Sequence, residues 1–132
     1  MGLRQVISIE NAAVGPYSPA VHVGDTLYIS GQIPLNFETG HMVTGPIAEQ
    51  ARQSLDNIGR ILSRAGFDWG DLVKCTILLT DINDFAAVNE VYAQYVRQPY
   101  PARAAYAVAA LPKNAAIEIE AIAVRDAAAP SH

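Results

Sequence analysis

Hydrophobic and polar residues alternate over several short stretches of this chain and recur at helical spacing over two longer ones. Two-residue alternation predicts β-strands over 5–9, 20–23, 26–30 and 72–80, and two last strands near 103–108 and 117–124. Gly24 and Asp25 form a two-residue turn of the kind that closes a hairpin. Within 72–80, alternation places Val73, Cys75, Ile77 and Leu79 on one face.

Two helices are expected between these strands. The first begins near Pro46, carries apolar residues at helical spacing and stops at Gly66; its stripe is Ile47, Ala51, Leu55, Ile58, Leu62 and Ala65. The second is capped by Asn83 or Asp84 and cannot continue past Pro99; its stripe is Phe85, Val88, Val91, Tyr92 and Tyr95. The order β-β-β-α-β-α-β-β predicts an α+β fold, with two helices packed on one face of a mixed sheet.

The other face of the predicted sheet is mixed in character. Tyr28, Leu78, Ile122 and Val124 lie there beside polar side chains. On a monomer such a face would be an exposed apolar patch, so we expect another subunit to cover it. Any pocket on this face would then lie at or near a subunit boundary.

Composition narrows the class of protein. The chain has 132 residues, of which 51% are apolar and 17% charged, which predicts one globular domain over 1–126 followed by a frayed tail over 127–132. The net charge of −4 and the scattered basic residues argue against nucleic acid as a partner. One cysteine, no apolar signal-peptide core and no membrane-spanning run predict a cytoplasmic protein without a membrane partner.

An arginine and two glutamates interrupt the most apolar strands. If the strand of Arg103 pairs with that of Glu118 and Glu120, they would form a small apolar pocket with one cation and at least one acid. A guanidinium can bind a carboxylate in a bidentate pair, although an ion pair with a glutamate of this chain or an acid of another subunit remains the alternative for Arg103. Desolvation would raise the pKa of Glu118 and let it hold or activate a water, unless it too forms a buried salt bridge. A structural partner is the favoured role for Glu120.

Four uncharged residues could complete such a pocket. Tyr17 lies in a loop bracketed by prolines, and Ser30 precedes Gly31, where a ligand could approach the backbone. Asn89 lies within the second helix, off its core stripe. Each also fits a plainer description. Tyr17 would be a loop tyrosine, Ser30 and Gly31 a turn at the end of a strand, and Asn89 a solvent-facing helix residue.

Other chemistries find little support in the sequence. His22, His41 and His132 fit no zinc-ligand spacing. Cys75 is expected on the helix-covered side, as a buried thiol. Because the chain also has no phosphate-binding glycine loop, we expect neither a metal nor another cofactor.

Several motifs together resemble a known family. They are Gly15-Pro16-Tyr17-Ser18, Ser30-Gly31-Gln32-Ile33-Pro34, Gln50-Ala51-Arg52-Gln53-Ser54-Leu55-Asp56-Asn57, Pro101-Ala102-Arg103, Leu111-Pro112-Lys113 and Ile117-Glu118-Ile119-Glu120-Ala121-Ile122-Ala123. In this order they resemble the Rid family of reactive-intermediate deaminases, also called the YjgF family. The resemblance extends from about Ile7 to Arg125.

The resemblance implies a chorismate-mutase-like α+β fold assembled as a homotrimer, with pockets between subunits. It implies hydrolysis of 2-imino and enamine acids, such as 2-aminoacrylate, 2-iminopropanoate and 2-iminobutanoate, to 2-keto acids and ammonia without metal or cofactor. Arg103 matches the family's carboxylate-binding arginine, and Glu118 matches the acid that positions the attacking water. Tyr17, Ser30, Gly31 and Asn89 match positions that line the pocket.

One segment departs from the family pattern. Similar deaminases usually have a serine, a cysteine and an apolar residue where this chain has Ala104, Ala105 and Tyr106. Ala105 therefore removes a thiol from a substrate-binding position and enlarges the pocket. This departure keeps two alternatives open: a non-catalytic trimer that binds or senses small carboxylates, and a deaminase of a larger, aminomuconate-type acid. Endoribonuclease activity, attached to some relatives, is disfavoured by the acidic charge.

Overall fold

The computed structural model describes residues 3–125, which form a sheet with helices on one side. The strands are β1 (Gln5–Ile7), β2 (Ala20–Val23), β3 (Thr26–Gln32), β4 (Leu72–Leu79), β5 (Ala102–Ala107) and β6 (Ile117–Val124), and the α-helices are α1 (Ile47–Ala65) and α2 (Phe85–Tyr92). This confirms the predicted α+β class and element order. The predicted tail, 127–132, lies outside the described residues.

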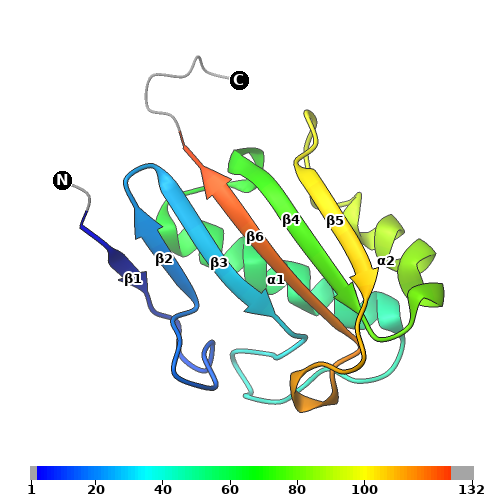
Figure 1. The fold of residues 1–132 in the computed structure, drawn as a ribbon. Helices are drawn as coiled ribbons and strands as arrows, with labels where there is room; N and C mark the ends of the chain where they lie inside the picture. Colours follow the sequence, from blue (N-terminus) through cyan, green and yellow to red (C-terminus); the bar gives the residue numbers. More distant parts are fainter. Residues whose placement is uncertain (1–2, 126–132) are drawn as a thin grey trace.

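The sheet has the strand order β1-β2-β3-β6-β4-β5 (Figure 1). β4 and β5 are parallel, and the other neighbouring pairs are antiparallel. Because β4 and β5 are parallel, they are joined by a crossover, which contains α2. β5 lies at the edge of the sheet, and β6 pairs with the other side of β4. The pairing considered for the strands of Arg103 and Glu118 is therefore wrong, since β4 separates them.

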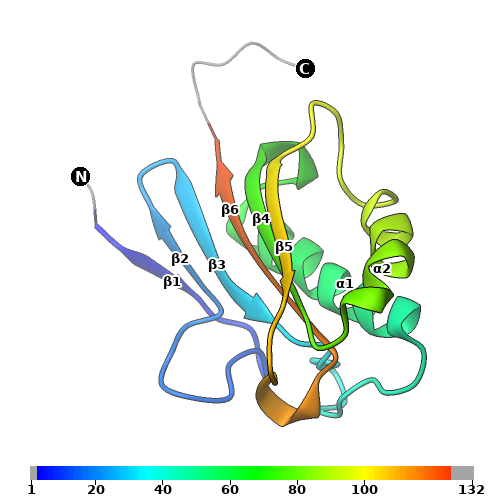
Figure 2. The same cartoon turned by 45° about the vertical axis from the view of Figure 1, so that its right-hand side comes forward.

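The core lies between the sheet and the two helices (Figure 2). Leu55, Ile58 and Leu62 of α1 are buried against Leu27 and Ile77 of the sheet. Full burial of one such side chain contributes about 1.5–3 kcal/mol, so this layer dominates the stability of the fold.

The ends of the helices follow local chemistry. Pro46 precedes α1, and Gly66 ends it with a positive φ of 80°, while the N–H groups of Gly66 and Phe67 bond to carbonyl groups of the last turn. At α2, Asp84 occupies the cap position but makes no side-chain capping bond. Instead Asp81 caps a preceding 3₁₀ turn, Ile82–Asp84, by accepting from the Asn83 N–H at 2.9 Å.

One residue pair in β4 departs from simple alternation. Leu72 is buried, whereas Val73 is 44% exposed, the reverse of the prediction. The register between β4 and β6 shifts between Leu72 and Lys74, so the extra residue of this bulge turns Val73 outward. Beyond the bulge, Cys75, Ile77 and Leu79 face the helices as expected.

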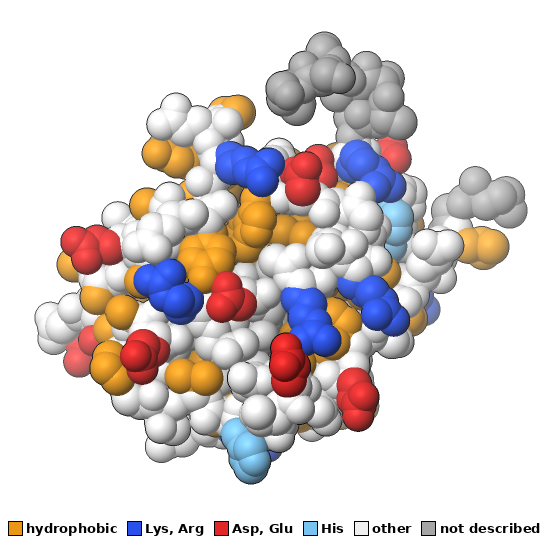
Figure 3. Space-filling view, turned by 180° about the vertical axis from the view of Figure 1, so that it is seen from behind, with side chains coloured by type: hydrophobic (Ala, Val, Ile, Leu, Met, Phe, Trp, Pro, Cys, Tyr) orange, Lys and Arg blue, Asp and Glu red, His pale blue; other side chains and the backbone are white. Residues whose placement is uncertain are grey.

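The two faces of the molecule differ. On the side that carries the helices, basic and acidic side chains are interspersed (Figure 3). No helix covers the opposite face of the sheet (Figure 2). This face exposes large side chains, including Tyr28 at 51% and Tyr106 at 52%. Within residues 3–125, neither helix has the length and apolar character needed to cross a membrane.

Candidate functional site

Arg103 lies on the edge strand β5, directly after the proline-rich turn that follows α2. It is opposite Cys75 of β4, a buried residue that faces the helices. The Arg103 guanidinium lies 5.2 Å from the ring centroid of Phe85 and 4.9 Å from that of Tyr92. Its Nη1 donates a hydrogen bond to Asn89 Oδ1 at 2.6 Å. Three α2 side chains therefore hold this guanidinium in place.

No acid of the described chain neutralises Arg103. Among residues 3–125, no carboxylate oxygen lies within 4.0 Å of its guanidinium, so the ion pair with Glu118 or Glu120 does not form within the chain. A cavity of about 370 Å³ adjoins it, lined by Asn89, Tyr92, Tyr100, Pro101 and Arg103. This volume accommodates a small organic acid, and an arginine without a carboxylate partner is a suitable receptor for one.

Glu118 lies on the other face of the sheet. It is opposite Leu78 of β4, and its carboxylate covers Gly31 of β3 so closely that a Cβ there would lie 1.9 Å from Oε2. Partial burial raises the pKa of the Glu118 carboxyl, and the nearby negative charge of Glu120 raises the pKa further. Such a carboxylate is a better proton acceptor than an ordinary surface glutamate.

The loop that contains Tyr17 is attached to the same end of β3. The Ser30 hydroxyl donates to the Ser18 carbonyl oxygen at 2.6 Å, and the Ser30 N–H donates to that of Pro19 at 3.0 Å. Tyr17 is 46% exposed, and its hydroxyl accepts from the Val14 N–H at 3.3 Å. Hydrogen bonds and the close contact at Gly31 thus connect this loop, Ser30 and Glu118.

The predicted site residues therefore form two groups on opposite faces of the sheet. Arg103 and Asn89 belong to the helix-covered side, together with Ala105, which is opposite Ile77 and packs partly buried against the core. Ser30, Gly31 and Glu118 belong to the group at the open face. Within one chain, the arginine and the glutamate do not share a pocket.

Asn89 is exposed, as a solvent-facing helix residue would be, but it does not lie away from Phe85 and Tyr92 as expected from the sequence. Phe85, Asn89 and Tyr92 follow one another at i, i+4 and i+7, and all three contact Arg103, so they share one helix face. The roles of Phe85 and Tyr92 at the site were missed because their spacing matched a core stripe. An asparagine between two aromatic residues on one helix face was the signal that could have revealed them.

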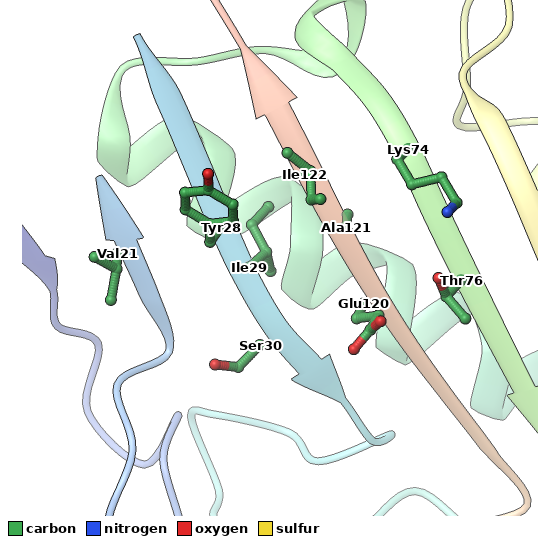
Figure 4. A pocket seen from close by; sticks show the side chains of 9 residues that line it. All are labelled: Val21, Tyr28, Ile29, Ser30, Lys74, Thr76, Glu120, Ala121 and Ile122. Carbon is green, nitrogen blue, oxygen red and sulfur yellow. The ribbon is translucent and has the colours of Figure 1, made fainter. Parts of the chain in front are cut away.

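The open face also holds a second hollow, of about 320 Å³, which was not predicted (Figure 4). Its polar side chains are those of Tyr28, Ser30, Lys74, Thr76 and Glu120, which come from three strands. Ser30 links this hollow to the Glu118 group. Within the described residues, no cluster of three or more His, Cys, Asp or Glu side chains could hold a metal ion.

Comparison with known proteins places the chain in a family. The family model described as endoribonuclease L-PSP matches residues 8–125, almost all of the described chain. Solved structures of Rid proteins superpose closely; one of them, RidA from an Antarctic Psychrobacter, has a TM-score of 0.88 at 47% identity, over 92% of this chain and 99% of that one. The chain belongs to the Rid family, also called the YjgF or L-PSP family.

Two further members of the Rid family bear on its chemistry. A human protein named 2-iminobutanoate/2-iminopropanoate deaminase is 55% identical over 125 residues, which cover 93% of this chain and 91% of the human one. TdcF of E. coli, whose structure contains bound serine, has a TM-score of 0.86 at 43% identity, over 92% of this chain and 99% of that one.

Proposed function

We propose that this protein hydrolyses 2-imino and enamine acids, such as 2-aminoacrylate, 2-iminopropanoate and 2-iminobutanoate, to 2-keto acids and ammonia. The observation that carries the proposal is the Arg103 guanidinium, held by α2 beside a cavity and without a carboxylate partner among residues 3–125. The 55% identity to a human deaminase of such imines supports the same chemistry.

Each half of the substrate has a matching group. The substrate carboxylate would form a bidentate pair with Arg103, which fixes the position and plane of the imine. Glu118 would hold a water and take its proton as the water oxygen bonds to the imine carbon, while the π electrons of C=N move to nitrogen. The proton taken by Glu118 passes to that nitrogen, and the proton of the new hydroxyl group follows it as the C–N bond breaks, so the carbonyl forms and ammonia leaves. An enamine first tautomerises to the imine by gaining a proton at carbon and losing one from nitrogen.

We propose that the two groups meet between subunits of a chorismate-mutase-like homotrimer, with Arg103 and Asn89 from one subunit and Tyr17, Ser30, Gly31 and Glu118 from its neighbour. The location of Arg103 and Glu118 on opposite sheet faces supports this arrangement. The exposed aromatic side chains of the open face also support it, because such a face is stabilised when another subunit covers it.

Ala105 is compatible with catalysis in this proposal. The steps above use Arg103, Glu118 and water, and none of them uses a thiol. We expect the alanine to leave more room for the carbon chain of the substrate. The preferred acid could then be larger, up to the aminomuconate type.

Binding without catalysis is the main alternative. The serine bound to TdcF is an amino acid with a free carboxylate, so a relative of this chain holds such a group without any imine. A protein that bound 2-ketobutyrate yet gave no rate above the uncatalysed reaction would be a carboxylate-binding or regulatory trimer. Ribonuclease activity, named in the family description, is disfavoured by the net charge of −4.

The decisive variant is Arg103→Ala. Loss of charge-assisted hydrogen bonds, each contributing about 1.5–3 kcal/mol, should lower kcat/KM for 2-aminoacrylate at least about 100-fold, with the substrate generated from serine by a dehydratase. Arg52→Ala is the matched control, because Arg52 is an exposed arginine of α1 that donates a hydrogen bond to Gln94 and does not line the cavity beside Arg103. Full activity of Arg103→Ala would contradict the proposal, and so would RNA cleavage that survives it in rigorously purified protein.

A further inference from the structure

The face of α2 that touches Arg103 consists of two aromatic rings with an amide between them. We propose that Phe85 and Tyr92, which we call the aromatic clamp, are positioning residues that fix the Arg103 guanidinium for the substrate carboxylate. The consequence for turnover rests on the proposed function, whereas the orientation of the guanidinium does not.

The clamp follows from the position of β5 in the sheet. β5 is an edge strand in the described chain, and Arg103 is an exposed residue with a long, flexible side chain. Left in solvent, such a side chain samples many rotamers and must be ordered when a ligand binds. The two rings, at 5.2 and 4.9 Å, and the 2.6 Å hydrogen bond that Arg103 donates to Asn89 order it before binding.

Tyr92 is firmly anchored, so its ring is a rigid support. The residue is only 6% exposed, and within residues 3–125 its buried hydroxyl lies beside the Cys75 thiol without forming a regular hydrogen bond. Burial raises the pKa of the Tyr92 phenol well above its usual value and also raises the pKa of the Cys75 thiol. Both acids near Arg103 therefore stay neutral and do not compete for its charge.

The part of the Arg103 guanidinium that the rings and Asn89 leave free is suited to binding a carboxylate. Cation–π contacts engage the face of a guanidinium, whereas a carboxylate binds its edge, in the plane. Asn89 accepts from Nη1, which leaves the other N–H donors of the guanidinium for a ligand. The adjoining cavity, with Tyr100 and Pro101 in its wall, lies beside this cluster.

Substitutions that remove one ring separate positioning from simple core packing. We expect Tyr92→Leu and Phe85→Leu each to raise KM for 2-aminoacrylate, and Kd for 2-ketobutyrate, by roughly 3- to 30-fold, with kcat within about threefold of wild type. Tyr92→Phe and Phe85→Tyr keep the rings and should stay within about twofold of wild type. If the rings only packed against the core, the leucine variants would have a lower melting temperature but would not show a raised KM with an almost unchanged kcat.

An NMR measurement tests the clamp without any turnover. Ring currents from two nearby aromatic rings should shift the Nε–H signal of Arg103, assigned with Arg103→Lys, away from that of an exposed arginine such as Arg52. The shift should decrease in the two leucine variants and persist in Tyr92→Phe and Phe85→Tyr. An ordinary Arg103 signal in wild type would overturn the clamp, even if every leucine variant failed to fold.

The outcomes distinguish this inference from the proposed function. If Arg103→Ala is inactive but folded Phe85→Leu and Tyr92→Leu keep wild-type KM and Kd, the clamp is wrong and the deaminase proposal stands. If Arg103→Ala retains full activity while the ring-current shift is present, the deaminase proposal fails and the clamp remains as a property of this arginine.

Discussion

Glu118 shows how the surroundings of a single residue set its chemistry. Because burial and the charge of Glu120 raise its pKa, the folded protein favours protonated Glu118 more than the unfolded chain does. This contribution to stability is complete below the unfolded pKa of about 4.3 and is lost as pH rises through the folded value. At neutral pH the carboxylate is therefore held at some cost in stability, which suits a proton acceptor.

Glu120→Gln tests this electrostatic coupling. Removing the Glu120 charge should lower the pKa of Glu118, so the acid limb of kcat/KM against pH should move to lower pH. Glu90→Gln, an exposed substitution on α2, is the control and should leave the limb in place. An acid limb that stays fixed or moves to higher pH in Glu120→Gln would show that Glu118 does not govern it.

At the scale of elements, two junctions form the candidate site, one between strands and a helix and one between two strands. One is the crossover from β4 through α2 to β5, which places three side chains of α2 against Arg103. The other is the irregular pairing of β3 with β6, where the register shifts between Ile29 and Gln32. At that shift Gly31 lies directly beneath the Glu118 carboxylate, with no side chain between them.

Gly31→Ala tests the second junction. The new Cβ would lie 1.9 Å from Oε2 and 2.7 Å from Cδ of Glu118, and since Gly31 lacks a positive φ, its backbone accepts alanine and Glu118 must move. We expect kcat/KM to fall roughly 10- to 100-fold, with about 1–3 kcal/mol lost in stability. Kinetics and thermal unfolding measure the two effects.

Gly70→Ala provides the matched control for this substitution. Gly70 lies in an exposed 3₁₀ turn, also without a positive φ, and its new Cβ would lie 3.1 Å from Asp68 Oδ1. It should retain activity. Wild-type kcat/KM in Gly31→Ala would mean that the position of the Glu118 carboxylate is unimportant.

At the scale of the whole molecule, the helices protect only one face of the sheet. The other face exposes Tyr28, Tyr106 and Val124 and contains the hollow lined by Lys74 and Glu120. A monomer with this face would leave Arg103 and Glu118 in separate half-sites. The proposed trimer would solve both problems at once, by covering the face and by joining the half-sites.

Tyr28→Glu tests the assembly. A buried, unpaired charge in the interface should dissociate the trimer and abolish deaminase activity while the circular dichroism spectrum stays that of a folded chain. Light scattering after size exclusion measures the mass. Ile82→Glu is the control, because Ile82 is similarly exposed, at 53%, but lies in the turn before α2. A trimeric, active Tyr28→Glu protein would contradict the proposed interface.

The sequence by itself determined the elements, their order, most of the core and the candidate residues proposed to carry the chemistry. These follow from periodicity, from end signals such as Gly66, and from charged residues such as Arg103 and Glu118 in apolar strands. Only the tertiary structure decided that β4 separates those two strands, that Val73 turns outward at a bulge, and that Asn89 shares a face with two rings. The physical reason is that periodicity reports a segment's own conformation, whereas strand partners, register and the contacts of a side chain depend on segments far away in the chain.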